Sequence, residues 1–208
     1  MDEFGPHGET IIDYSIYDAL SAGFRKLVFI IRKSFAGEFI KRMESRWEGK
    51  AEMDFVFQEL DILPANYSYP KERTKPWGTG HAVWVARNTI QESFGVINAD
   101  DFYGRDAMKI LCNFLTDEKQ FAVIAYLLKN TLSEFGAVNR GICEVDQNGL
   151  LLKINERKNI QKADDIYFEI DEVRHILKPD TLVSMNMWAF RRSYFDWAEA
   201  YFSDFLEK

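Results

Sequence analysis

The chain has 208 residues, 47% of them hydrophobic and 28% charged, a composition typical of folded globular proteins rather than disordered ones. Its formal net charge of −7 argues against a general nucleic-acid binder, because such proteins carry a clustered basic face. No apolar run is long enough to span a bilayer, and the first residues, MDEFGPHGE, lack a leader-peptide pattern. Cys112 and Cys143 have no CxxC neighbour, so two buried free thiols are expected. We therefore expect one compact domain in the cytoplasm, without nucleic-acid or membrane partners.

The first part of the chain alternates between helical and strand periods. Apolar spacing, with Gly23 and Gly49 as stops, predicts helices over residues 10–22, 34–47, 79–93 and 105–116. Short apolar runs predict strands over residues 27–31, 54–58, 94–98 and 121–128. Three prolines between residues 58 and 79 predict a loop there. This alternation predicts an α/β fold of the Rossmann-like type, with a mostly parallel mixed sheet and helices on both faces.

The last third of the chain has a different pattern. ICEV and LLLKINE flank Asn148–Gly149, a strong hairpin signal. A further strand is predicted over residues 182–190 and an amphipathic, aromatic-rich helix over residues 192–206. Core packing or a subunit contact explains these aromatic residues better than ligand stacking does, so a homo-oligomer remains open.

Two adjacent carboxylates follow the strand predicted at residues 94–98. Asp100 would lie just beyond a buried strand, where an uncompensated carboxylate is costly. Mg²⁺ prefers oxygen ligands and takes one or two carboxylates together with substrate phosphates, so Asp100 is a candidate metal ligand. A second interpretation is that Asp100 and Asp101 cap the following turn or helix. The pair alone leaves both interpretations open.

A glycine-containing loop and a glutamine are candidates for contact with a flat ligand. Gly78, Thr79 and Gly80 open a predicted helix, and glycines allow backbone N–H groups to approach a base or a phosphate. Gln58 ends a predicted strand with a donor and an acceptor on one amide, which suits the edge of a base. Each signal is weak alone. The basic residues of the loop between them are interpreted as solvated, and no histidine is expected to be catalytic.

The order of these segments resembles the sugar-phosphate nucleotidyltransferase family. Gln58 is followed by GTGHA, VINADDFYG, RGICEVDQNG and INERK, and the resemblance covers nearly the whole chain. It implies the fold of nucleotide-diphospho-sugar transferases. Its implied site residues are Gln58, Gly78, Thr79 and Gly80 for the nucleotide, Asp100 for the catalytic Mg²⁺, and Gly141, Glu156, Arg157 and Asn186 for the sugar phosphate.

The chain departs from the family pattern at its start, because MDEFGPHGETI resembles the residues just after the family's first strand and glycine-rich loop. The family's second metal-binding aspartate is also not placed. We expect one domain over residues 1–208, shortened at both ends relative to the family, with the first central strand missing. The strands at residues 27–31 and 94–98 would then close directly, accept a strand from another chain, or belong to a fragment of a longer product.

The resemblance implies transfer of a nucleoside monophosphate from a nucleoside triphosphate to a sugar 1-phosphate, with release of pyrophosphate. Activity of this chain without the glycine-rich loop stays open. One alternative is a metal-dependent glycosyltransferase, in which Asp100 and Asp101 hold the diphosphate of a nucleotide sugar through the cation. Another is a nucleotide-binding module without catalytic activity. We further expect Asp100 to share one cleft with Gln58 and the glycine pair.

Overall fold

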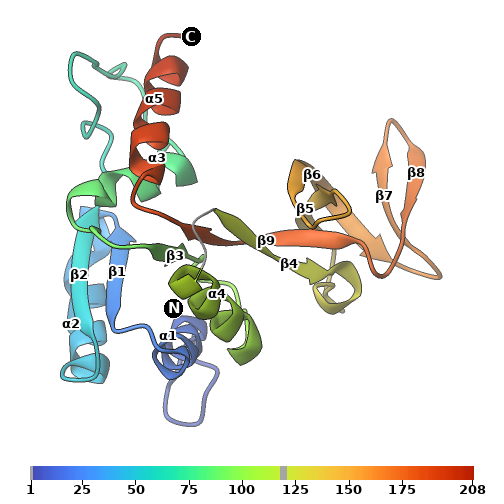
Figure 1. Ribbon diagram of the computed structural model, residues 1–208, viewed down its shortest axis with the longest axis horizontal. Coiled ribbons are helices and arrows are strands. Elements are labelled where there is room, and N and C mark those ends of the chain that lie inside the picture. The colour runs from blue at the N-terminus through green and yellow to red at the C-terminus, as the bar shows by residue number, and fades with distance from the viewer. Residues whose placement is uncertain (1, 118–120) are drawn as a thin grey trace. The chain divides into compact units, whose positions relative to one another are not determined.

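A computed structural model describes residues 2–117 and 121–208 and divides them into two compact units (Figure 1). The first unit holds the described parts of Met1–Val96, Phe102–Phe121 and Ala189–Lys208. The second unit holds Ile97–Asp101 and Ala122–Trp188. The chain therefore enters the second unit twice and returns to the first unit for its last helix.

The first unit combines helices with short strands. Its elements are α1 (Ile11–Ala22), β1 (Lys26–Ile31), α2 (Ala36–Trp47), β2 (Glu52–Phe57), α3 (Thr79–Val85), β3 (Phe94–Val96), α4 (Arg105–Asp117) and α5 (Tyr194–Leu206), with 3-10 turns at Lys33–Phe35 and Ala86–Asn88. The helix predicted over residues 79–93 is shorter than expected, because α3 ends at Val85 and gives way to the second of these 3-10 turns. No helix in the described residues is long and apolar enough to cross a membrane.

The parallel pair β1–β2 follows from two short apolar runs in the sequence. Phe29 is paired with Phe55 in the register, and their rings stack with centroids 5.3 Å apart. α1 and α2 cover this pair, since Ile12, Ile16 and Met43 are buried in the same cluster as Phe29. Such continuous apolar runs are typical of parallel strands that are covered by helices.

The two strands expected to flank a missing strand are not paired with each other. In the described residues, β1 pairs with β2, and β3 is the neighbour of β9 (Leu182–Phe190), whose last residues belong to the first unit. Phe94 of β3 and Phe190 of β9 pack with ring centroids 5.8 Å apart. Direct closure of β1 onto β3, one of the three expected outcomes, is therefore wrong.

The second unit is built from antiparallel strands. Its elements are β4 (Ala122–Leu127), β5 (Val138–Val145), β6 (Leu151–Lys162), β7 (Ile166–Ile170), β8 (Val173–Leu177) and most of β9, with a 3-10 turn at Leu128–Asn130. β5 pairs antiparallel with both β6 and β9, and β7 pairs antiparallel with β6 and β8. The α/β class is confirmed, but the expectation of a mostly parallel sheet is not, because these pairings outweigh the parallel β1–β2 pair.

The β7–β8 hairpin was not expected from the sequence. Its turn residues, Asp171 and Glu172, have φ angles of 48° and 65°. Two-residue hairpin turns of this kind need positive φ at both positions, and Asn-Gly or Asp-Gly is the usual signal for them. The sequence Asp-Glu lacks that signal, whereas Asn148–Gly149 between β5 and β6 has it, and there Gly149 has a φ of 79°.

A buried carboxylate ties α1 to α2. Asp13 is 3% exposed, and its carboxylate accepts hydrogen bonds from the backbone and hydroxyl of Thr10 and from the indole of Trp47. Guanidinium nitrogens of Arg42 and Arg46 lie 3.6 and 3.8 Å from Oδ2 of Asp13. Burial acts to raise the pKa of Asp13, but the Thr10 and Trp47 hydrogen bonds and the charge of Arg46 together lower it.

The lowered pKa of Asp13 predicts acid-dependent stability. Its stabilising contribution is present above the unfolded value of about 3.9 and is lost as the pH falls through the lower folded pKa. Asp13→Asn is expected to lower the free energy of unfolding at pH 7 by about 1.5–3 kcal/mol, measured by urea denaturation. Glu44→Gln, an exposed change of the same charge on α2, is the control. Equal stability of the two variants would contradict this role.

The turn at Asp171–Glu172 predicts a stabilising substitution. Glu172→Gly removes the cost of a left-handed backbone for a residue with a side chain, so the free energy of unfolding should rise by about 0.5–1 kcal/mol. Glu169→Gly, inside β7, should have the opposite sign because glycine weakens a strand. Thermal unfolding of both variants measures the difference, and a fall in melting temperature for Glu172→Gly would contradict the turn assignment.

Candidate functional site

Gln58 follows β2 directly and faces the start of α3. Its backbone N–H donates to the carbonyl of Ile31 at 2.9 Å, which continues the β1–β2 ladder by one residue. Its side-chain Nε2 donates to the carbonyl of Gly78 at 2.9 Å and lies 3.2 Å from Nδ1 of His81. The structure therefore brings together Gln58 and the glycine loop, which the sequence placed 20 residues apart.

His81 is buried beneath this contact, with 2% of its surface exposed. Its Nε2 lies 2.7 Å from the carbonyl of Ile62, and its ring packs 5.0 Å from that of Phe202. A carbonyl oxygen only accepts, so the proton is on Nε2 and Nδ1 is the acceptor for Gln58. The pKa of His81 is lowered, mainly because the ring is buried. The hydrogen bond to the Ile62 carbonyl acts to raise this pKa, and the charge of Arg87 acts to lower it.

Gly78 is the residue at which the loop turns into α3. It has a φ of 103°, a conformation that residues with a Cβ rarely adopt, and a Cβ there would meet no atom within 4 Å. The requirement for glycine is therefore one of backbone conformation. Thr79 and Gly80 are exposed in the first turn of the seven-residue α3.

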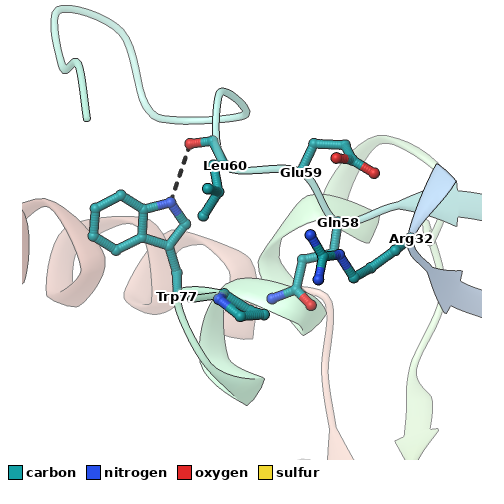
Figure 2. Close-up of a pocket in the computed structure, with 6 residues that line it drawn as sticks. Arg32, Gln58, Glu59, Leu60 and Trp77 are labelled. Carbon is teal, nitrogen blue, oxygen red and sulfur yellow. Dashed lines mark hydrogen bonds between the residues drawn. The ribbon is translucent and has the colours of Figure 1, made fainter. Parts of the chain in front are cut away.

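A shallow pocket adjoins Gln58, with a cavity volume of about 10 Å³ (Figure 2). Its lining residues come from the ends of β1 and β2 and from the loop before α3, and they are Arg32, Gln58, Glu59, Leu60, Pro76 and Trp77. The indole of Trp77 donates to the carbonyl of Leu60 at 3.1 Å, which fixes one wall (Figure 2). The pocket combines a cation, a carboxylate, an amide and an indole at one sheet edge.

Arg73 has a structural role in the same loop. Its guanidinium stacks 3.6 Å from the centre of the Trp77 ring and donates to the carbonyls of Lys75 and Pro76. These contacts explain the arginine without a ligand, but Arg73 is packed against the loop rather than solvated as expected.

Asp100 lies in the second unit, in a turn after β3. The strand ends at Val96, and Asp100 is exposed, so the argument that its charge needs compensation in a dry environment is wrong. Asp101 is half-buried and accepts a hydrogen bond from Asn98 at 2.9 Å. Burial, with a smaller contribution from the Asp101 charge, raises the pKa of Tyr126. That Asp100 shares a cleft with Gln58 of the first unit stays a prediction.

The two adjacent carboxylates are chemically suited to a magnesium ion. Mg²⁺ is usually held by one or two carboxylates and keeps its other positions for water and substrate phosphates. Asp100 and Asp101 supply two such groups from consecutive residues. Among residues 2–117 and 121–208, no group of three or more His, Cys, Asp or Glu residues could hold a metal by itself.

Gly141 and Glu156 face each other across β5 and β6. They are partners in the register, and a Cβ on Gly141 would lie 2.7 Å from Cγ2 of Ile154 and 3.6 Å from Oε2 of Glu156. On its other side Gly141 pairs with Ser184 of β9. Gly141 is buried, and the approach of Ile154 leaves no room for a side chain at this position beside the exposed carboxylate of Glu156.

Arg157 and Asn186, the other two sugar-phosphate candidates, have different surroundings. Arg157 follows Glu156 in β6, so their side chains point to opposite faces, and its guanidinium lies 5.1 Å from the Phe168 ring centre. Asn186 is exposed within β9 with a φ of 61°, and its N–H donates to the hydroxyl of Ser184 at 3.1 Å. Asn186 therefore adjoins Ser184, which pairs with Gly141. Arg157 instead packs on the face of β6 opposite to Glu156.

Arg32, which lines the pocket, and His81, which contacts the Gln58 amide, were not identified from the sequence. Arg32 follows β1 just as Gln58 follows β2, and the carboxyl ends of parallel strands meet at one sheet edge, so this position was a usable signal. His81 carried no such signal, because its role depends on the carbonyl of Ile62.

Comparison with curated proteins identifies two uridylyltransferases. One is the UTP–glucose-1-phosphate uridylyltransferase 1 of Staphylococcus saprophyticus, 22% identical over 211 residues, covering 90% of this chain and 63% of the relative. Another is the UTP–glucose-1-phosphate uridylyltransferase of Bacillus subtilis, 33% identical over 101 residues, covering 43% of this chain and 33% of the relative. The chain thus spans less than two thirds of the length of these relatives.

The fold and the family agree with these likenesses. HddC from Yersinia pseudotuberculosis superposes with a TM-score of 0.52 at 15% identity, covering 88% of this chain and 64% of that one, which shows a shared fold. The family model described as "Nucleotidyl transferase" matches residues 3–206, nearly the whole sequence. The chain therefore belongs to the nucleotidyl transferase family.

Proposed function

We propose that this protein transfers a nucleoside monophosphate from a nucleoside triphosphate to a sugar 1-phosphate and releases pyrophosphate. The observation that carries this proposal is the family match over residues 3–206. The two curated relatives are both UTP–glucose-1-phosphate uridylyltransferases, which makes UTP and glucose 1-phosphate the first substrates to test.

The first unit supplies the proposed nucleotide-binding residues. Gln58 presents its amide beside a pocket walled by Trp77, and Gly78 to Gly80 offer exposed backbone next to it. A polar amide can hold the edge of a base through hydrogen bonds. We assign Gln58, Gly78, Thr79 and Gly80 to the nucleotide.

The second unit supplies the proposed sugar-phosphate residues. Gly141 pairs with Glu156 in the register, and the exposed carboxylate of Glu156 is suited to accept hydrogen bonds from sugar hydroxyls. Asn186 adjoins this pair through Ser184. Arg157 has the charge for a phosphate, and reaching the Glu156 face requires its side chain to leave Phe168.

The proposed reaction is an in-line displacement at phosphorus. A phosphate oxygen of the sugar 1-phosphate forms a bond to the α-phosphorus, and the bond between the α-phosphorus and the α,β-bridging oxygen breaks. Pyrophosphate leaves with that electron pair, so no covalent enzyme intermediate is needed. Such chemistry depends on positioning and charge stabilisation rather than on a protein nucleophile. Asp100 is the proposed ligand of Mg²⁺, which when bound neutralises charge on the phosphates.

Product analysis tests the proposal against its rivals. The chain is incubated with UTP, glucose 1-phosphate and Mg²⁺, and pyrophosphate and UDP-glucose are quantified together. The proposal predicts equal amounts of both products, each dependent on both substrates. Release of UDP when UDP-glucose and a sugar acceptor are supplied would instead identify a glycosyltransferase. Binding of UTP without turnover would identify a nucleotide-binding module.

The role of Asp100 has its own test. Asp100→Asn should lower the rate of pyrophosphate release by at least about 100-fold, because metal stabilisation of a phosphoryl transition state contributes several kcal/mol. Asp164→Asn, an exposed change of the same charge in the second unit, is the matched control and should keep the rate. An Asp100→Asn variant with the rate of this control would remove the residue from the site.

A further inference from the structure

The last helix, α5, divides its aromatic residues between two faces. On the inner face Phe195 and Phe202 are buried, and Phe202 belongs to the same core cluster as Trp84 of α3. On the outer face Trp197 and Tyr201 are 59% and 69% exposed, and their rings stack with centroids 6.5 Å apart. Contiguous exposed apolar surface of this kind marks interaction sites in soluble proteins. The outer pair is therefore a candidate for contact with another molecule.

The outer face of α5 is also acidic. The helix contains Asp196, Glu199 and Asp204 and has no lysine or arginine. All three acids are exposed, and none of them forms an ion pair among residues 2–117 and 121–208. Residues three or four apart are neighbours on a helix, so the exposed Ala200 is flanked by Asp196, Asp204 and Trp197. Aromatic and negatively charged side chains thus share one surface.

An open hollow borders the same face, with a cavity volume of about 470 Å³. Its lining residues all come from α5, and they are Asp196, Glu199, Ala200 and Ser203. Glu199 is held in place, because its carboxylate accepts a hydrogen bond from the indole of Trp84 at 3.2 Å. The small side chain of Ala200 leaves space between the carboxylates. The hollow therefore has room for a positively charged side chain that comes from outside.

Other tryptophans of the chain indicate what would cover Trp197. Trp77 and Trp84 each have an arginine over the ring, with the guanidinium of Arg73 or Arg87 lying 3.6 Å from the ring centre. The face of an aromatic ring attracts cations in this way. In the part of the chain that the structure describes, no lysine or arginine lies over Trp197. A cation for this ring has to come from another molecule.

We propose that the outer face of α5 is a docking surface for a basic segment of a partner protein. An arginine of that segment stacks on Trp197 and pairs with the carboxylate of Asp196 or Asp204. Arginine suits this place because its planar guanidinium both stacks on aromatic rings and binds carboxylates through two hydrogen bonds. Trp, Tyr and Arg are also the side chains that are enriched at protein interfaces. The inference goes beyond the proposed function and does not depend on it.

Charge complementarity excludes the other occupants of this face. A second copy of α5 packed against the first would bring acidic residues of both helices together, and like charges across an interface are unfavourable. Nucleic acids and anionic lipid surfaces carry the same sign of charge as the helix. A basic polypeptide satisfies both the exposed aromatic pair and the acids around it.

A synthetic peptide tests the docking surface on the full chain. A blocked peptide with arginine and leucine at helical spacing is titrated by calorimetry, beside a peptide with glutamate in place of arginine. Only the arginine peptide should bind, and Trp197→Ala should weaken its binding by at least about tenfold. Phe135→Ala is the matched control, because it removes an aromatic side chain that is 99% exposed in the second unit. This control should keep the affinity of the unsubstituted protein.

A second pair of variants separates a local site from general attraction to a negative protein. Asp196→Asn combined with Asp204→Asn should weaken binding of the arginine peptide by about tenfold, because the paired carboxylates are lost. Asp164→Asn combined with Asp165→Asn changes the net charge equally on the exposed surface of the second unit and should have little effect. Equal weakening by the two combinations would mean non-specific attraction and would overturn the proposal.

The remaining outcomes are equally decisive. Absence of binding of the arginine peptide overturns the proposal, as does a Trp197→Ala variant that binds it as well as the unsubstituted protein does. Sedimentation of the protein alone tests the second copy as occupant. Self-association that Trp197→Ala abolishes would assign this face to a homo-oligomer and overturn the basic partner.

Discussion

The hydrogen bond between the Gln58 amide and the Gly78 carbonyl is the contact on which the proposed nucleotide site depends. It joins the end of β2 to the start of α3 across 20 residues of chain. Loops of this length without regular structure are uncommon in compact domains and usually functional. Trp77 holds the loop through the Leu60 carbonyl, and His81 holds Gln58 from below. The contacts with Gly78 and His81 thus fix the side chain that is proposed to contact a base.

The candidate site of the second unit is closely packed around a glycine. Gly141 sits between Glu156 and Ser184 on neighbouring strands, where a methyl group would collide with Ile154. The left-handed backbone at Asn186 lies in the strand that carries Ser184. Such backbone conformations are concentrated at functional sites, which agrees with a role for this region in binding.

Local sequence patterns predicted much of the fold. The features that they did not predict are determined by contacts between residues far apart in the sequence. The apolar run at residues 27–31 marked β1, and Asn148–Gly149 marked the β5–β6 turn. The β7–β8 hairpin lacked a signal because its turn is Asp-Glu, and the extent of antiparallel pairing was underestimated because period alone does not give strand direction. At the site, Gln58 was visible as the residue after a strand. The role of His81 was not, since it arises from a partner fixed by tertiary folding.

A structure of the chain with UTP bound tests the central claim most directly, because it locates the base relative to the Gln58 pocket. The account predicts that the base lies within hydrogen-bond distance of the Gln58 amide, next to the pocket lined by Arg32 and Trp77. A nucleotide bound elsewhere, with Gln58 still closed onto Gly78 and an empty pocket beside it, would contradict the account.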